Sequence, residues 1–355
     1  MAEDRVEAVL QTLTLAQKAS LCSGASSWTT RALPERGVPS VFMADGPTGL
    51  RKEDPEHATE NGGPSVKATC FPTEATLANS WDPALAASVG CAIGAECRAH
   101  EVAMLLAPGV NMKRSPLCGR NFEYYAEDPL LAGKLAASFI RGLQAQGVGC
   151  SLKHFAANNQ ETLRLTISSE VDERALREIY LRAFEGSLAE GDSLGVMTAY
   201  NRIGVMYAAA NQGIQHILRD EWNYGGYIID DALTASEYSS APEMLMAGNN
   251  IFCLDTARPN EIEKLITSTD DGDLLQKVID SNHYLYYIML QSSMGGSGAE
   301  DVVVSDAAPW WQTTLRALDV VFCALAVAAV VMYVLHTYTD VFSEEKRKNR
   351  AAKKN

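Results

Sequence analysis

The sequence predicts an α/β protein built as a TIM-type (β/α)8 barrel, with allowance for irregular strands, followed by a single C-terminal transmembrane helix. Three observations support this prediction. Short apolar runs alternate with helical patterns, polar residues follow the apolar runs, and a long apolar stretch lies near the C-terminus. The clearest strand end is Gly226–Asp231, where an apolar run stops at two aspartates. Buried carboxylates are costly unless they are paired or used, so this strand end indicates a functional site.

Composition limits the class of protein. The chain has 355 residues, 47% of them hydrophobic, which suits one large domain with an appendage. Its formal net charge of −14 argues against nucleic-acid binding and is compatible with a neutral substrate. The eight cysteines form no CxxC pair and no zinc-ligand spacing, so we predict no metal and no other cofactor.

Alternating apolar and helical segments indicate parallel strands joined by helical crossovers. Six such units are visible where a closed barrel needs eight, and we expect the missing two to be short or irregular, with Val66–Cys70 as a candidate. An open doubly wound sheet is the alternative, although no glycine-rich turn follows the first strand. The predicted strands are Ser40–Ala44, Ala103–Ala107, Gly149–Leu152, Leu194–Ala199, Tyr227–Ile229 and Asn250–Leu254. The predicted helices are Pro83–His100, Pro129–Gln146, Asp172–Glu190, Gln212–Trp222, Ser236–Ala247 and Glu261–Leu290, the last broken near Asp270 and Asp271.

The C-terminal part differs in composition from the rest. Leu318–Tyr338 is almost entirely apolar and just reaches the ~20 residues that a membrane-spanning helix needs. Tryptophans precede it and a basic tail follows it, as expected at membrane interfaces. We therefore divide the chain into a barrel domain (1–291), a flexible linker (292–309), a transmembrane helix with its interfacial flanks (310–340) and a basic tail (341–355). A buried core helix is the alternative.

Membrane localisation follows from this helix, with the lipid bilayer as a partner. The positive tail places the globular domain outside the cytoplasm by the positive-inside rule. The N-terminal stretch Met1–Leu21, however, is charged and amphipathic and has no apolar signal core. The side of the membrane on which the domain lies therefore stays open.

Five motifs, in this order, make the sequence similar to the N-terminal barrel of the family 3 glycoside hydrolases of the β-glucosidase type. The resemblance covers about Leu13 to Asp255. The motifs are Asp45–Arg51, Cys118–Tyr124 with Ala126–Pro129, Lys153–Glu161, Met197–Asn201 and Gly226–Asp231.

The resemblance implies a role for each of six residues. Asp231 takes the position of the catalytic nucleophile, and Tyr200 that of the hydroxyl that orients it. Four others match residues that bind sugar hydroxyls: Asp45, Arg120, Lys153 and His154. Each has a structural alternative: a turn aspartate for Asp45, an acidic strand-end turn for Asp231, an ion pair with Glu123 or Glu127 for Arg120, and a core position for His154 or Tyr200. Lys153 and His154 are adjacent, so both can reach one ligand only at an irregular strand end.

The sequence departs from the family pattern in three places. Asp230 replaces the usual Ser or Thr, and as a second adjacent carboxylate it should raise the proton affinity of one of the two aspartates. The alternatives are that it weakens the nucleophile or turns out to solvent. Ala232 replaces the tryptophan that normally follows the nucleophile. The α/β sandwich domain that commonly supplies the acid/base residue is not expected in this chain, and no residue of the chain is identified as the acid.

Two functions from different classes remain open. The first is hydrolysis of O-glycosidic bonds, retaining and β-glucosidase-like, acting on a β-glucoside or related small saccharide. Its acid/base would come from a partner chain that carries the sandwich domain. The second is a non-catalytic, membrane-anchored sugar-binding module or degenerate glycosidase. Glu161 and Arg164 are interpreted as an ion pair of the scaffold, and Trp28 as a core or interface residue.

Overall fold

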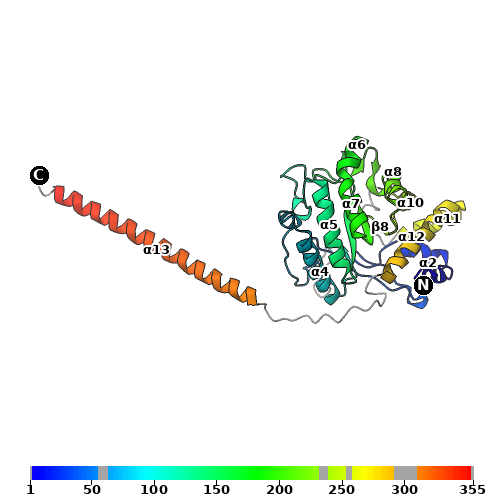
Figure 1. The fold of residues 1–355 in the computed structure, drawn as a ribbon, viewed down its shortest axis with the longest axis horizontal. Helices are drawn as coiled ribbons and strands as arrows, with labels where there is room; N and C mark the ends of the chain where they lie inside the picture. The colour runs from blue at the N-terminus through cyan, green and yellow to red at the C-terminus, as the bar shows by residue number, and fades with distance from the viewer. Residues whose placement is uncertain (1, 55–62, 232–238, 253–257, 292–309, 353–355) are drawn as a thin grey trace. The chain divides into compact units, whose positions relative to one another are not determined.

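The computed structural model describes residues 2–54, 63–231, 239–252, 258–291 and 310–352. The chain divides into two compact units, Met1–Val302 and Val303–Asn355 (Figure 1). The first unit holds a parallel sheet with helices packed around it, and the second holds one helix. Ala232, the predicted departure after the nucleophile position, and the predicted linker 292–309 lie outside the described residues.

A five-stranded parallel sheet forms the centre of the first unit, with its strands in chain order. Each strand is short and nearly all of its residues are buried, as in parallel sheets covered on both faces. The strands are β1 (Met43–Asp45), β2 (Met104–Leu106), β3 (Gly149–Phe155), β5 (Gly195–Thr198) and β8 (Tyr227–Ile229). These strands confirm five of the predicted six.

Isolated bridges continue the pairing beyond both edges of this sheet. Ile229 at the end of β8 pairs in parallel with Ile251, at the position of the sixth predicted strand. Phe252 pairs with Ser23, Gly24 pairs with Thr30, and Thr29 pairs with Phe42, next to β1. The prediction of a strand near Val66–Cys70 was wrong, because these residues are described and form no strand. Residues 23–30 instead carry the bridges that connect Phe252 with Phe42. Their sequence does not indicate this pairing, because it lacks an apolar run.

The crossover helices confirm the predicted alternation, and their N-termini follow from the sequence. Asp82 and Asp128 cap α4 and α5 through their carboxylates, each with proline at the first helical position. Two segments are π-helical, η3 (Leu176–Tyr180) and η5 (Ile217–Glu221). The predicted break near Asp270 separates α11 from α12. The helices are α1 (Ala2–Leu10), α2 (Leu15–Leu21), α3 (Glu74–Ala78), α4 (Pro83–Ala99), α5 (Pro129–Gln144), α6 (Glu173–Ala175), α7 (Arg182–Gly191), α8 (Gln212–His216), α10 (Ala241–Ala247), α11 (Arg258–Thr269) and α12 (Gly272–Gln291).

Close packing of α4 on α5 depends on two glycines. A Cβ at Gly142 would lie 2.0 Å from the Ala87 carbonyl oxygen, and one at Gly90 would lie 2.3 Å from that of Phe139. The side of the sheet covered by α4, α5 and α7 carries the largest hydrophobic core, and α1 and α12 pack on a second core (Figure 1). The strands are thereby held rigidly, and the residues at their carboxyl ends take fixed positions.

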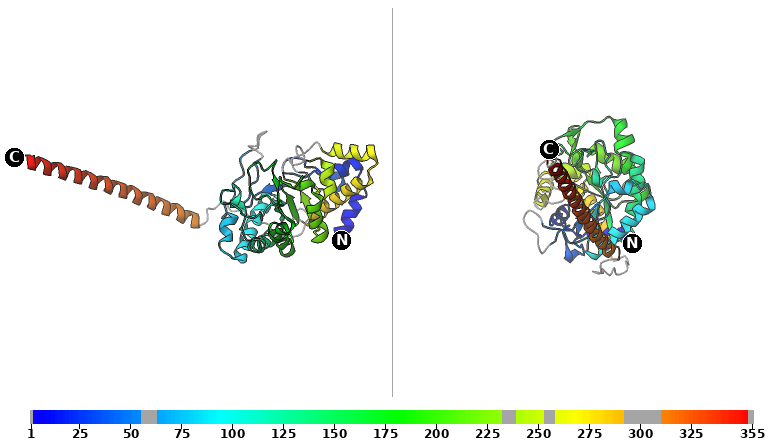
Figure 2. Two further views of the ribbon diagram at one scale, coloured as in Figure 1. Left: turned by 90° about the horizontal axis from the view of Figure 1, so that it is seen from above. Right: turned by 90° about the vertical axis from the view of Figure 1, so that its left-hand side faces the viewer.

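The second unit contains α13 (Trp310–Ala352), drawn from two further directions in Figure 2. Within it, residues 313–344 form one helix that is long and apolar enough to cross a membrane, with a mean hydropathy of 2.6 in its most apolar window. This finding rests on length and composition alone.

Candidate active site

Polar side chains from the carboxyl ends of β1, β3 and β8 and from the loops after β2 and β5 meet around one cavity of about 370 Å³. Its size falls in the range of small-molecule pockets, and it lies at the carboxyl ends of parallel strands, where α/β proteins commonly bind ligands. All six residues that the sequence singles out lie in its wall: Asp45, Arg120, Lys153, His154, Tyr200 and Asp231. The other lining residues are Ser27, Trp28, Arg51, Leu106, Arg164 and Met197.

Asp45 and Lys153 form the first charged pair of the cavity. The Lys153 Nζ lies 2.6 Å from Asp45 Oδ1 and 3.5 Å from Glu123 Oε2. Burial opposes the charge on Asp45, but Lys153 and Arg51 outweigh burial and hold the pKa of Asp45 below its usual value. Burial likewise opposes the charge on Lys153, and the two carboxylates hold its pKa above the usual value. Both groups are therefore ionised at neutral pH, ready to bond neutral hydroxyl groups.

Arg120 makes both the ion pair and the cavity contact that the sequence left as alternatives. Its Nε lies 2.5 Å from Glu123 Oε1, and its Nη2 lies 2.7 Å from His154 Nε2. An arginine can only donate, so His154 Nε2 accepts and the ring proton sits on Nδ1, 3.1 Å from the Tyr124 hydroxyl. Burial, with Arg120 and Lys153 adding, holds the pKa of His154 well below its usual value. His154 is thus a neutral, oriented imidazole.

The predicted irregularity at the end of β3 is present. The pairing of β3 with β5 changes register between Leu152 and Phe155, and the Lys153–His154 peptide is cis. Both side chains are buried and both line the same cavity, which regular strand alternation would forbid.

Asp231 and Asp230 differ sharply in their surroundings. The Asp231 side chain is 13% exposed and lines the cavity, with its Oδ2 3.8 Å from His154 Nε2. Tyr200 shares a hydrogen bond with Asp231, and burial together with this neighbouring carboxylate raises the pKa of Tyr200. The tyrosine hydroxyl therefore keeps its proton and can donate it to the Asp231 carboxylate in a hydrogen bond. Asp230 is fully buried and is absent from the cavity wall, so the expectation that it turns out to solvent was wrong.

Sequence reasoning missed several residues of the site. Arg164 does pair with Glu161 at 3.0 Å, as interpreted, but its guanidinium also lies 4.7 Å from the centre of the Tyr200 ring and lines the cavity. Trp28 lines the cavity too, and its indole donates to Glu53 at 2.9 Å. The spacing of Arg164 after the Lys153–His154 motif was a usable signal. No local pattern places Trp28 there, because residues 23–30 reach the site only through long-range pairing.

Beneath the charged residues lies a further buried acid, Glu74, at the start of α3. Its two oxygens accept from the Gly109 amide at 3.2 and 3.3 Å. Burial, with the nearby Glu123 adding, raises the pKa of Glu74 well above its usual value, whereas Lys153 opposes the shift. The folded protein therefore holds a proton that the unfolded chain releases above about pH 4.5. Stability from this group is complete below that pH and is lost as the pH rises through the folded pKa.

We expect Glu74→Gln to stabilise the protein at pH 8 and to have little effect at pH 4. Glutamine keeps an acceptor for the Gly109 amide and does not titrate. It therefore removes the loss of folding free energy that Glu74 causes as the pH rises, which is about 1.4 kcal/mol for each pH unit between the unfolded and folded pKa values. Urea unfolding of both proteins at the two pH values measures the difference. Equal destabilisation at pH 4 and pH 8 would contradict the protonated state of Glu74.

Fold and cavity together define the class of protein: a parallel α/β domain with a polar site at the carboxyl ends of its strands. The chain belongs to the glycosyl hydrolase family 3 N-terminal domain family, whose model matches residues 53–284. The resemblance stated from the motifs is thus confirmed at the level of the family.

Relatives with known names are similar over most of this chain. Thermostable beta-glucosidase B of Acetivibrio thermocellus is 44% identical over 278 residues, which cover 78% of this chain and 36% of the relative. Beta-glucosidase B of Emericella nidulans is 42% identical over 277 residues, 78% of this chain and 32% of the relative. The chain therefore spans about a third of the length of these curated relatives.

Solved structures show the same fold similarity. The GH3 beta-glucosidase of Bifidobacterium adolescentis is 38% identical with a TM-score of 0.75, over 83% of this chain and 42% of that one. Beta-glucosidase 3B of Thermotoga neapolitana in complex with glucose is 38% identical with a TM-score of 0.73, over 82% and 43% of the two chains.

Proposed function

We propose that this chain is the sugar-binding and nucleophile-bearing part of a retaining β-glucosidase. The observation that carries the proposal is the convergence of Asp45, Arg120, Lys153 and His154 with Asp231 around one cavity. In this proposal the sheet closes into an irregular barrel. The closure runs from β8 through residues 251–252 and 23–30 back to β1. The closure places all the strand ends around a common site.

Each residue has a defined task in the proposed mechanism. Asp45 and Lys153 bind the hydroxyls of the sugar as acceptor and donor. Asp231 attacks the anomeric carbon as the glycosidic bond breaks and the aglycone departs with the electron pair, which gives a glycosyl ester that water then hydrolyses with retention. Tyr200 orients the attacking carboxylate through its hydroxyl, because its raised pKa keeps the proton on the tyrosine. Neutral His154, fixed by Arg120 and Tyr124, offers no proton of its own on Nε2.

No general acid is assigned among the described residues of the cavity wall. Among the described residues of the cavity wall, the carboxyl groups are Asp45 and Asp231. Asp45 is unsuited to donate a proton, because its lowered pKa keeps it ionised. We therefore propose that a partner polypeptide with an α/β sandwich domain supplies the acid/base residue. The relatives are about three times as long as the region that they share with this chain.

Leaving-group dependence tests the proposed function. The chain alone should release dinitrophenolate from 2,4-dinitrophenyl β-glucoside, since this group departs without protonation. Hydrolysis of methyl β-glucoside should be slower than this release, because its leaving group needs protonation. The missing protonation alone should slow it by ~10²–10⁴-fold, the usual contribution of general acid catalysis. Initial rates for the two substrates measure the ratio. Similar rates would place an acid within the chain, and glucose binding without any release would identify a sugar-binding module.

We also propose that α13 anchors the protein in a lipid bilayer through residues 313–344. The length and hydropathy of this helix support the proposal, as do its exposed apolar side chains and the basic residues that follow. After reconstitution into phosphatidylcholine vesicles, the protein should stay with the vesicles in alkaline carbonate. Its release into the supernatant would contradict a membrane-spanning helix.

A further inference from the structure

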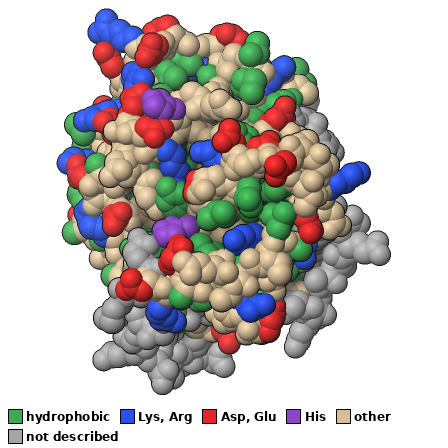
Figure 3. Space-filling view, turned by 90° about the vertical axis from the view of Figure 1, so that its right-hand side faces the viewer, with side chains coloured by type: hydrophobic (Ala, Val, Ile, Leu, Met, Phe, Trp, Pro, Cys, Tyr) green, Lys and Arg blue, Asp and Glu red, His purple; other side chains and the backbone are tan. Residues whose placement is uncertain are grey.

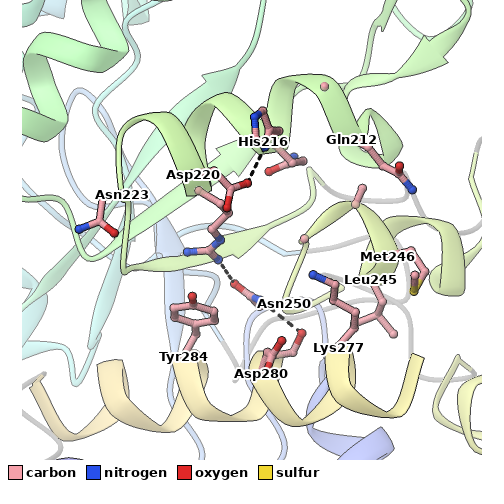
Figure 4. Close-up of a pocket in the computed structure, with 16 residues that line it drawn as sticks. Gln212, His216, Asp220, Asn223, Leu245, Met246, Asn250, Lys277, Asp280 and Tyr284 are labelled. Carbon is pink, nitrogen blue, oxygen red and sulfur yellow. Dashed lines mark hydrogen bonds and ion pairs between the residues drawn. The ribbon is translucent and has the colours of Figure 1, made fainter. Parts of the chain in front are cut away.

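A second and larger cavity, of about 750 Å³, lies between α8–η5 and α12, beside the end of α10 (Figure 4). It shares no lining residue with the candidate active site. Its wall includes Asn250, just before the bridge at Ile251, and Arg219, which bonds the carbonyl of Gly226 just before β8. It therefore lies near the amino end of β8, whereas Asp231 follows the carboxyl end of that strand.

The helices beside the cavity differ in length. α10 has seven residues and spans about 10 Å, whereas α12 has twenty and spans about 30 Å. Facing surfaces of neighbouring helices are normally apolar and interdigitate. Here the wall positions are polar on both sides, and those on α8 and η5 are exposed to solvent. They are Gln212, His216 and Asp220 on one wall, and Lys277, Asp280, Ser281 and Tyr284 on the other (Figure 4).

The floor of the cavity is built rigidly around Arg219. Its guanidinium donates to the carbonyls of Tyr224 and Gly226 at 2.8 and 2.5 Å and to Asn250 Oδ1 at 2.7 Å. It lies 4.1 Å from the centre of the Tyr284 ring. Asn250 in turn donates to the Ser281 hydroxyl at 3.3 Å. These bonds hold the Arg219 guanidinium and the Asn250 side chain in fixed positions in the floor.

Several polar groups in the wall have capacity left for a ligand. Within the described parts of the chain, Lys277 makes no hydrogen bond or ion pair, and Figure 4 shows its amine directed into the hollow. Gln215 is 1% exposed and its Oε1 has no hydrogen-bond partner there, an unusual state for a buried acceptor. Asp280 accepts one hydrogen bond, from Gln276 at 2.8 Å. A donor, a buried acceptor and a carboxylate therefore line one hollow.

The charges of the wall point to an uncharged ligand. Arg219 and Lys277 are balanced by Asp220 and Asp280, and His216 is bonded to Asp220 at 2.7 Å. On the face of the molecule in Figure 3, acidic and basic side chains are likewise interspersed. A balanced wall selects neither anions nor cations, whereas mixed donors and acceptors suit hydroxyl groups, which both donate and accept. Apolar contact is limited to a few residues such as Leu245 and Met246.

We propose that this cavity is a second saccharide-binding site, which takes a neutral oligosaccharide and acts independently of the candidate active site. The test is calorimetric titration of the full chain with cellotriose, using Asp45→Asn to disable the first site. Binding to the Asp45→Asn chain should persist. Adding Lys277→Met should weaken it by about 10- to 100-fold, as expected for one charge-assisted hydrogen bond.

Three controls make the result decisive. Lys264→Met removes an exposed lysine of α11 outside the cavity and should leave the affinity unchanged. Gln212→Ala changes the opposite wall and should also weaken binding, and thermal unfolding of each variant verifies its fold. The proposal is overturned if the Asp45→Asn chain gives no binding heat, if Lys277→Met has no effect, or if sodium phosphate binds there and displaces cellotriose. Failure of the first site alone would leave binding to the Asp45→Asn chain intact.

Discussion

Replacing Asp231 by asparagine is expected to slow dinitrophenolate release from 2,4-dinitrophenyl β-glucoside by about 10⁴-fold or more, the size of effect seen when a catalytic nucleophile is removed. The amide is nearly isosteric with the carboxylate but cannot form the glycosyl ester. Because the leaving group needs no acid, the loss reports the nucleophile alone. The initial burst of dinitrophenolate, followed by stopped-flow absorbance with saturating substrate, measures it.

Asp230→Asn is the matched control for this prediction. The two aspartates are adjacent in sequence, but Asp231 lines the cavity whereas Asp230 is fully buried away from it. Release by Asp230→Asn should stay within about tenfold of the unmodified chain. A reversed order, with Asp230→Asn inactive and Asp231→Asn active, would refute the assignment of the nucleophile.

Lys153→Met is expected to lower the free energy of unfolding by about 3 kcal/mol at pH 7. Removing one partner of a buried pair typically costs about 3–5 kcal/mol. The lower end applies because the Asp45 side chain is 30% exposed and keeps Arg51 at 3.8 Å, while Glu123 keeps Arg120 at 2.5 Å. Glu123, 6% exposed, loses the same partner. Glucose affinity should fall as well, since a donor to the sugar is lost. Urea unfolding and glucose titration measure the two effects.

An exposed ion pair supplies the control for Lys153. Lys134 bonds Glu190 at 2.6 Å, with side chains 52% and 43% exposed. Lys134→Met should change the free energy of unfolding by no more than about 1 kcal/mol, because surface pairs contribute little. An equally small effect of Lys153→Met would show that the cavity carboxylates are solvated and would weaken the proposed binding site.

The sequence was sufficient to predict the strands and helices where hydrophobic pattern and capping agree. β3 and β5 read as apolar runs, and Asp82 and Asp128 mark the starts of their helices. Pairing of residues 23–30 could not be predicted, because these isolated bridges depend on tertiary contacts and not on a local pattern. Membership of the family follows from the motifs; the closed barrel and the membrane anchor remain predictions.

The candidate site was predictable in its members more than in its electrostatics. Motif order selected the residues that the structure brings together, yet no motif shows that His154 is neutral, since its state depends on Arg120 and Tyr124 from another loop. Burial of Asp230 was equally hidden, because adjacent aspartates look alike in sequence. The second cavity had no sequence signal, because Gln212, His216 and Asp220 recur every fourth residue as on any solvent-exposed helix face.

Covalent capture of the intermediate tests the central claim most directly. The full chain should be incubated with 2,4-dinitrophenyl 2-deoxy-2-fluoro-β-glucoside, which forms the glycosyl ester but hydrolyses slowly, and then digested for mass spectrometry. The account predicts one fluoroglucosyl group on the peptide that contains Asp231, and none after Asp231→Asn. Absence of label from the unmodified chain, or label on a different residue, would contradict it.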